Sequence, residues 1–264
     1  MKERVISQFP NLDHENELKS QGYELIAGID EVGRGALAGP VVASAVILPH
    51  PANLPWFGLV RDSKELTSRK RESLFDLINK EAVAVGIGIV PSQVIDSINI
   101  LKATKLAMMQ AVGKLPKQPH FLIIDRVTLS QCPIPQKGIT RGDKLCLSIA
   151  CASIIAKVTR DRMMEEFDQL YPGYGFAQHK GYGTGEHLSC LRKLGPSPIH
   201  RLYFAPVRNI ITGQISGHLA SAHSEPFSFC HSDPLPSCHS EGAERPKNLI
   251  EGKLREGSRD EPIH

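Results

Sequence analysis

Two adjacent carboxylates, Asp30 and Glu31, follow directly on an apolar run, and a Gly33-Arg34-Gly35 sequence comes one residue later. Such an apolar run is typical of a buried strand, and unpaired acids at its end are costly unless a cation neutralises them. Hard divalent cations prefer carboxylate oxygens. The glycines let the backbone approach a ligand, and the guanidinium of Arg34 suits a phosphate. These residues predict a metal-dependent site that acts on a phosphate ester.

Two further acids occupy positions from which they could join this site. Asp125 ends a short apolar strand predicted at residues 121–124, and Asp143 comes just before the longest predicted helix, at 145–170. Acids at strand ends and at a helix N-terminus can converge on one edge of an α/β sheet. Taken alone, Asp125 would be an ordinary turn acid and Asp143 an ordinary helix N-cap. Several acids around two divalent ions are what in-line phosphodiester hydrolysis needs, because one ion lowers the pKa of the attacking water and the other stabilises the leaving oxygen.

The hydrophobic pattern predicts the elements that must position these acids. Strands are expected at residues 24–32, 41–48, 82–90 and 121–124, and helices at 68–81, 92–114 and 145–170. The connection between the last strand and the last helix contains proline, and we predict no element there. This order of elements predicts an α/β fold, with a mixed sheet and helices packed on it.

The motifs taken together resemble those of bacterial ribonuclease HII. The matching segments follow the family's order within roughly residues 22–208, and they are 28–35, 62–64, 66–67, 124–125, 142–143, 152–161 and 174–184. The resemblance implies a ribonuclease H-like mixed β-sheet flanked by helices, with an added C-terminal helical segment, in a catalytic domain at residues 22–210. It also implies an endoribonuclease that hydrolyses the RNA strand of RNA–DNA hybrids and nicks 5′ to ribonucleotides embedded in duplex DNA. Its products would carry 3′-hydroxyl and 5′-phosphate ends, and its role would lie in DNA replication and repair.

The resemblance assigns the metal-binding and catalytic carboxylates to Asp30, Glu31, Asp125 and Asp143, with Mg²⁺ or Mn²⁺ as the cofactor. Asp161 is a competing candidate for the fourth position. It lies 18 residues beyond Asp143, which is roughly 27 Å along a straight helix and too far for one metal cluster. We therefore predict that Asp143 is the fourth ligand and that Asp161 is structural.

The resemblance also implies how the substrate is bound. Gly33, Arg34 and Gly35 fall on the turn that reads the ribose 2′-hydroxyl through backbone groups, and this hydroxyl is what separates RNA from DNA. Tyr182 falls on the tyrosine that packs on the neighbouring sugar at the RNA–DNA junction. Lys64 falls on a basic residue near the backbone phosphates. Without the resemblance, Tyr182 would be interpreted as a half-buried core tyrosine and Lys64 as a solvated lysine.

A few residues need separate interpretation. His179 and His187 could act as a general acid or bind a metal, but we expect both to make hydrogen bonds within the C-terminal segment. The chain departs from the family pattern at Arg126, where glycine is common, at Arg141, where lysine is usual, and at Cys151, in an alanine-rich run. None of these departures removes a carboxylate, so the predicted activity stands. Arg126 would affect how tightly the duplex or the second metal ion is held.

The two ends of the chain differ in composition from its centre. Residues 211–264 carry 5 basic and 8 acidic side chains, which leaves 26 and 20 for residues 1–210. The basic body is compatible with a nucleic-acid partner. We expect residues 1–21 to be an N-terminal extension and residues 211–264 to be a low-complexity, disordered tail, because proline, serine and glycine dominate an eight-residue repeat there. The Cys-His pairs of this repeat do not match zinc spacings, and truncation near residue 212 should leave activity intact.

Cysteine usage and hydropathy indicate the compartment. The six cysteines form no Cys-x-x-Cys pair, and the N-terminus lacks the apolar core of a signal peptide. No apolar run approaches the ~20 residues of a membrane span. These features predict a reduced, cytoplasmic protein without a membrane partner, and we expect a monomer.

Three other interpretations compete with a ribonuclease HII. A dinucleotide-binding protein is suggested by Gly33-x-Gly35-x-x-x-Gly39 after a strand, but the spacing is wrong and a strand follows where a helix is needed. A nucleic-acid-binding module without catalysis explains the basic body but not the four acids. Ribonuclease HIII, the sister family, has a different residue in place of Arg34 and an extra N-terminal domain, for which the residues before the first strand are too few.

Overall fold

A five-stranded mixed sheet forms the centre of the computed structural model, which describes residues 9–50 and 54–219. The strand order is β3-β2-β1-β4-β5. The strands are β1 (Ile26–Val32), β2 (Val41–Ile47), β3 (Ala84–Val90), β4 (Phe121–Asp125) and β5 (Gln136–Ile139). The β1–β2 and β2–β3 pairs are antiparallel, whereas β1–β4 and β4–β5 are parallel. The predicted α/β class and mixed sheet are confirmed.

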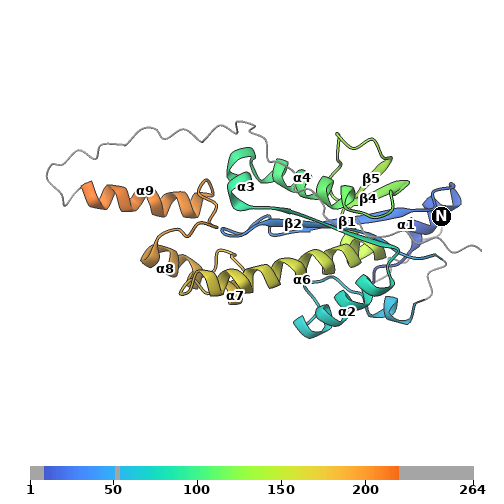
Figure 1. Cartoon of the computed structure of the whole chain (residues 1–264), viewed down its shortest axis with the longest axis horizontal. Coiled ribbons are helices and arrows are strands. Elements are labelled where there is room, and N and C mark those ends of the chain that lie inside the picture. Colours follow the sequence, from blue (N-terminus) through green and yellow to red (C-terminus); the bar gives the residue numbers. More distant parts are fainter. Residues whose placement is uncertain (1–8, 51–53, 220–264) are drawn as a thin grey trace, which may run out of the picture. The chain divides into compact units, whose positions relative to one another are not determined.

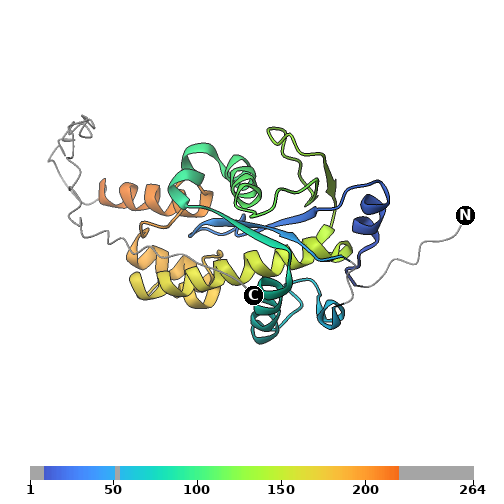
Figure 2. The same cartoon turned by 45° about the vertical axis from the view of Figure 1, so that its right-hand side comes forward.

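Helices cover both faces of this sheet (Figures 1 and 2). In both views the long helix α6 (Leu147–Leu170) runs along one face with α2 (Ser68–Glu81) beyond it, while α3 (Ser92–Ile98) and α4 (Ile100–Gly113) lie on the opposite face. The other elements are α1 (Asp13–Ser20), the 3-10 helix η1 (Pro55–Leu59), α5 (Gly142–Leu145), α7 (Phe176–His179), α8 (Gly185–Leu194) and α9 (Ala205–Leu219). The layered arrangement explains why β1 and β2 are so strongly apolar.

Strand β2 separates two hydrophobic cores. Ala45 and Ile47 belong to the core that packs against α4, whereas Val46 belongs to the core formed with α2 and α6. Successive side chains of a strand point to opposite faces of its sheet. A strand that is covered on both faces therefore needs an apolar residue at every position, and all seven residues of β2 are buried.

Three local features differ from the sequence prediction. Asn99 has a φ of 68° and divides the predicted 92–114 helix into α3 and α4, and its side chain caps α4 by accepting from the Lys102 N–H. Cys146 is extended and separates α5 from α6. The proline-containing connection, where no element was predicted, contains β5. Two of the four residues of β5 are exposed, so it lacks the apolar run by which the other strands are recognised.

The described parts near both ends of the chain pack on this sheet unit. Helix α1 lies within the predicted N-terminal extension, and its buried Glu15 accepts hydrogen bonds from the backbone N–H and the hydroxyl of Ser148, at 2.9 and 2.7 Å. Helix α9 continues to Leu219, past residue 210, where the sequence analysis ended the catalytic domain, and a cut near residue 212 would fall inside it. The eight-residue repeat lies outside the described residues. None of the helices that the structure describes has the length and apolar character to cross a membrane.

Candidate active site

Strand pairing brings the first and third predicted acids together. Ile29 of β1 is paired with Ile124 of the parallel strand β4, and Asp30 and Asp125 each follow one residue later. The two carboxylates therefore leave the same edge of the sheet. Their placement depends on the register of these two parallel strands. The apolar runs that precede both acids set this register.

Strand β1 does not bend at the Asp30–Glu31 pair. Strand β1 keeps its pairing with β2 as far as Val32, opposite Val42, and the chain turns only at Gly33, which has a φ of 91°. A Cβ atom at Gly33 would also lie 2.3 Å from Nε of Arg160. Because of this crowding and this backbone conformation, only glycine fits the position.

A pocket of about 400 Å³ gathers all four predicted carboxylates. Besides these acids it is lined by Lys64, Tyr182, Arg126 and four residues that the sequence analysis did not single out: Val32, Ser63, Ser153 and Lys157. The structure thus unites side chains from β1, β4, the loop before α2, the α5–α6 region and the segment after α7. A single serine, valine or lysine carries no positional signal in the sequence, so these four could have been found only through the matching motifs.

Burial dominates the electrostatics at Asp30 and Glu31. Asp30 is 6% exposed, and burial together with the neighbouring Glu31 raises its pKa well above its usual range, although the hydroxyl of Ser153 opposes this rise. Burial also raises the pKa of Glu31, and a hydrogen bond from Arg34 at 3.1 Å offsets part of that rise. Oε2 of Glu31 is buried and has no hydrogen-bond partner in the described chain. The guanidinium of Arg34 therefore compensates the charge of this pair only in part.

Asp125 connects strand β4 to the short helix that carries Asp143. Its Oδ1 accepts a hydrogen bond from the Gly142 N–H at 2.8 Å, and its Oδ2 lies 3.7 Å from Nε of Arg126. Asp143 does not cap a helix, because the N-cap positions of α5 and α6 are Arg141 and Cys146. Burial raises the pKa of Asp143, and the nearby carboxylates Asp62 and Asp125 raise it further.

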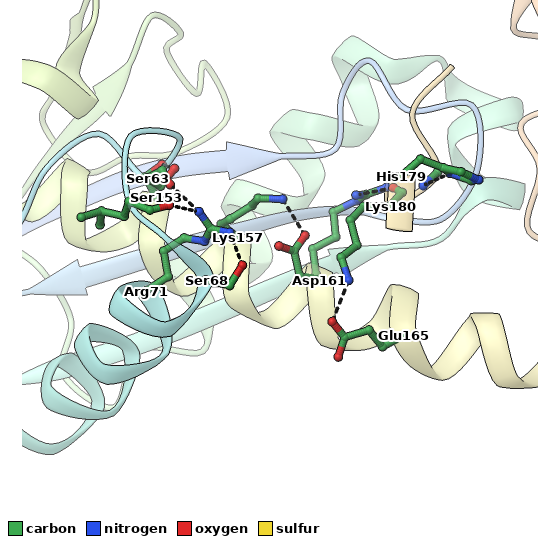
Figure 3. A network of polar contacts seen from close by, with 12 residues as sticks. Ser63, Ser68, Arg71, Ser153, Lys157, Asp161, Glu165, His179 and Lys180 are labelled. Carbon is green, nitrogen blue, oxygen red and sulfur yellow. Dashed lines mark hydrogen bonds and ion pairs between the residues drawn. The ribbon is translucent and has the colours of Figure 1, made fainter. Parts of the chain in front are cut away.

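Polar contacts along α6 support the pocket (Figure 3). Ser153 shares a hydrogen bond with Ser63 at 3.0 Å, and both side chains are buried. One turn later, Nζ of Lys157 contacts Oδ1 of Asp161 at 2.6 Å. Asp161 is not among the residues that line the pocket. Ser153, which contacts Asp30, is thus tied to a loop serine, and the pocket residue Lys157 is held by Asp161.

A chain of hydrogen bonds passes through His200 and His187 and ends at the backbone of Tyr182. The Ser197 N–H donates to Nδ1 of His200 at 2.9 Å, so His200 carries its proton on Nε2, which faces Nε2 of His187 at 3.0 Å. His187 must then donate from Nδ1 to the carbonyl oxygen of Tyr182, at 2.9 Å. Burial favours the neutral form of both rings, because it lowers the pKa of His200 to about 4 and also lowers that of His187.

His179 lies beside this hydrogen-bond chain and makes separate hydrogen bonds. It contacts the Tyr174 carbonyl oxygen at 2.7 Å and accepts from the Gly181 N–H at 3.2 Å. The predicted hydrogen-bonding roles of His179 and His187 in the C-terminal segment are confirmed.

The carboxylates line an open pocket and do not form a closed cage. Within residues 9–50 and 54–219, no three side chains of His, Cys, Asp or Glu are already close enough together to hold a metal ion. The donor set nevertheless fits a hard cation, because it consists of four carboxylates and includes the partnerless, buried Oε2 of Glu31. A divalent ion would satisfy this oxygen and neutralise the charge beside Asp30.

The fold and the pocket can be compared with known proteins. The family model described as Ribonuclease HII matches residues 27–207. The chain belongs to the ribonuclease HII family. A ribonuclease HII of Dehalococcoides mccartyi is 54% identical over 204 residues, which are 77% of this chain and 96% of the relative. The family prediction is therefore confirmed.

Solved structures share the fold. Ribonuclease H2 of Pyrococcus horikoshii has a TM-score of 0.60 and 26% identity, and the match covers 72% of this chain and 98% of that one. Bst-RNase HIII in complex with Mn²⁺ has a TM-score of 0.53 at 21% identity, covering 71% of this chain and 69% of that one, and shows the fold alone.

Membership of the ribonuclease HII family makes this chain a ribonuclease H, which is a hydrolase of the RNA in RNA–DNA hybrids. Enzymes of the ribonuclease H family depend on divalent metal ions. The dinucleotide-binding interpretation and that of a binding module without catalysis are therefore excluded.

Proposed function

We propose that this ribonuclease HII also nicks duplex DNA on the 5′ side of single embedded ribonucleotides, leaving 3′-hydroxyl and 5′-phosphate ends. One observation carries this proposal: the acids and Tyr182 line the same pocket, and Arg34 of the Gly-Arg-Gly turn contacts one of those acids. Groups suited to phosphodiester hydrolysis therefore lie beside groups suited to recognising one sugar. All of them come from a single chain, so we further propose a monomer. The cysteines that the structure describes are free thiols, as is usual in a reducing compartment, and we propose that the enzyme acts in the cytoplasm.

The turn at residues 33–35 presents free backbone donors to a substrate. The main-chain N–H groups of Arg34 and Gly35 have no hydrogen-bond partner among the residues that the structure describes. Gly35 is exposed, and no atom lies within 4 Å of the position that a Cβ would take there. A ribose 2′-hydroxyl could therefore reach these donors, and a deoxyribose would leave them unsatisfied.

The four acids, in this proposal, hold two ions of Mg²⁺ or Mn²⁺. These ions would supply an activated water nucleophile and stabilise the leaving oxygen. The chain's own residues already hold three of the acids in place, because Ser153 contacts Asp30, Arg34 contacts Glu31, and the Gly142 N–H donates to Asp125. Lys64 would face the backbone phosphates of the substrate, and Tyr182 would pack on the sugar next to the cut.

The test uses labelled duplex DNA that contains one ribonucleotide, incubated with Mg²⁺, with Mn²⁺ or with a chelator. We expect a metal-dependent nick 5′ to the ribonucleotide and no nick in the same duplex made entirely of DNA. Asp30→Asn should abolish the nick and leave binding of the hybrid largely intact. Near-normal turnover by that variant would reject the metal assignment, and the lack of a nick with folded wild-type protein would reject cleavage at single ribonucleotides.

A further inference from the structure

A fully buried arginine binds the Gly-Arg-Gly turn from inside the protein. Arg201 is 0% exposed. Its Nη2 donates to the Gly33 carbonyl at 2.7 Å, and its Nη1 donates to the Arg34 carbonyl at 2.9 Å. Nε and Nη2 both donate to the Gly39 carbonyl, at 3.1 and 2.9 Å. All these side-chain hydrogen bonds go to main-chain carbonyls of the 33–39 loop.

The segment around Arg201 holds this loop through its backbone as well. The Arg201 N–H donates to the Leu37 carbonyl at 2.8 Å, and the Gly39 N–H donates to the Ile199 carbonyl at 2.9 Å. A second fully buried arginine, Arg160 of α6, donates to three other carbonyls, which are those of Ala38, Pro40 and Lys180. The loop is thus fixed between the long helix and the C-terminal segment.

Burying this guanidinium is unfavourable unless its hydrogen bonds offset the free-energy cost of removing it from water. Burial and the neighbouring Arg160 lower the pKa of Arg201 to about 9, so the side chain remains a cation at neutral pH. A planar fork with five donors matches several carbonyls at once, whereas a lysine ammonium acts as a point charge. The contacts therefore need the shape of arginine as well as its charge.

Peptide planarity carries the effect of Arg201 to the substrate side of the turn. The carbonyl of Gly33 and the N–H of Arg34 belong to one rigid trans peptide group, in which they point in opposite directions. The carbonyl of Arg34 and the N–H of Gly35 form the next such group. By holding both carbonyls, Arg201 fixes both free N–H groups so that they point away from its own side chain.

We propose that Arg201 is a positioning residue that sets the discrimination between ribose and deoxyribose. It acts through the two peptide groups of the turn and does not touch the substrate. The inference rests on the proposed reading of the 2′-hydroxyl by this turn, and it adds the residue that orients the reading groups.

The experiment compares the full-length wild type with Arg201→Lys. Dissociation constants are measured in EDTA for a duplex with one ribonucleotide and for the same duplex in all-DNA form, and nicking is measured with Mg²⁺. We expect Arg201→Lys to bind all-DNA duplex within about twofold of wild type but to lose most of its preference for the ribonucleotide. Nicking should fall about 100-fold, which is the scale of a 1 Å misplacement of reacting groups.

Met108→Ala provides the matched structural control. Met108 is fully buried in the core on the α4 face of the sheet, so this variant is destabilised without touching the turn. It should unfold at a lower temperature and keep the wild-type preference ratio. If the role of Arg201 were purely structural, Arg201→Lys would behave like Met108→Ala, with a lower unfolding temperature and the wild-type preference ratio.

Wild-type preference and nicking in folded Arg201→Lys would overturn the inference. If that variant fails to fold, Arg201→Gln, which keeps a planar amide donor, takes its place with the same expected loss of preference. If the wild type itself shows no preference for the ribonucleotide, the proposed function fails, and the inference fails with it. The wild-type measurement thus separates the two failures.

Discussion

Replacing Gly28 by alanine should push strand β1 away from helix α6. A Cβ atom at Gly28 would lie 2.3 Å from the carbonyl carbon of Ser148 and 2.4 Å from the backbone nitrogen of Ile149. Ordinary van der Waals contact begins near 3.4 Å, so strand and helix would have to separate by about 1.1 Å. The obstacle is helix backbone, which cannot move aside as a flexible side chain can.

The separation should reach the active site. Gly28 and Asp30 are two residues apart on one strand and so face the same side, where Asp30 contacts Ser153 of α6. Overpacking of this kind costs about 1–3 kcal/mol of folding free energy. A displacement of about 1 Å can lower turnover by about 100-fold. We expect both effects in Gly28→Ala.

Urea unfolding and nicking kinetics would measure the two effects. Gly113→Ala is the control, because no atom lies within 4 Å of the Cβ position at that residue. It should leave turnover unchanged and alter stability by no more than about 1 kcal/mol. Wild-type stability and turnover in Gly28→Ala would refute the close strand–helix contact and its control of Asp30.

Three other changes have defined outcomes. Tyr182→Ala should impair cutting at a lone ribonucleotide more than cutting of long hybrids, and equal losses would contradict a junction-reading role. Burial raises the pKa of Glu15 above its unfolded value of about 4.5, so folding stability should fall as pH rises above about 4.5. Urea unfolding between pH 4 and pH 7 should show a smaller fall in stability for Glu15→Gln than for the wild type. An equal fall in both proteins would argue against this assignment. The pKa of His200 is lowered to about 4, so the folded protein should lose up to about 3 kcal/mol of stability as pH falls from about 6.5 to 4. In urea unfolding, His200→Gln should lose less stability over the same pH range.

The acids were predictable because each has a local signal. Asp30, Glu31 and Asp125 follow apolar runs of neighbouring strands, so the sheet brings them together. Asp143 lies just before a long helix, in α5, which a hydrogen bond from Gly142 joins to Asp125. The N-cap alternative for Asp143 could be excluded only with the backbone in view, because Arg141 and Cys146 occupy the cap positions.

The supports of the turn could not be predicted in the same way. Arg201 contacts carbonyls that lie more than 160 residues earlier in the chain, and Arg160 contacts carbonyls about 120 residues earlier. A carbonyl is present at every position, so the sequence at 33–40 gives no sign of its partner. For the same reason the link from His187 to the Tyr182 backbone emerged only from the structure.

Helix α6 fixes the spacing between the acids and the turn. Ser153 contacts Asp30, and Arg160, seven residues later, contacts the loop that follows the turn. Seven residues make about two helical turns and roughly 10 Å, so both side chains leave the same side of the helix. One inserted residue between them would rotate Arg160 by about 100° relative to Ser153. In evolution, this stretch of α6 should therefore accept neither insertions nor deletions, and changes in chain length should collect beyond Leu170.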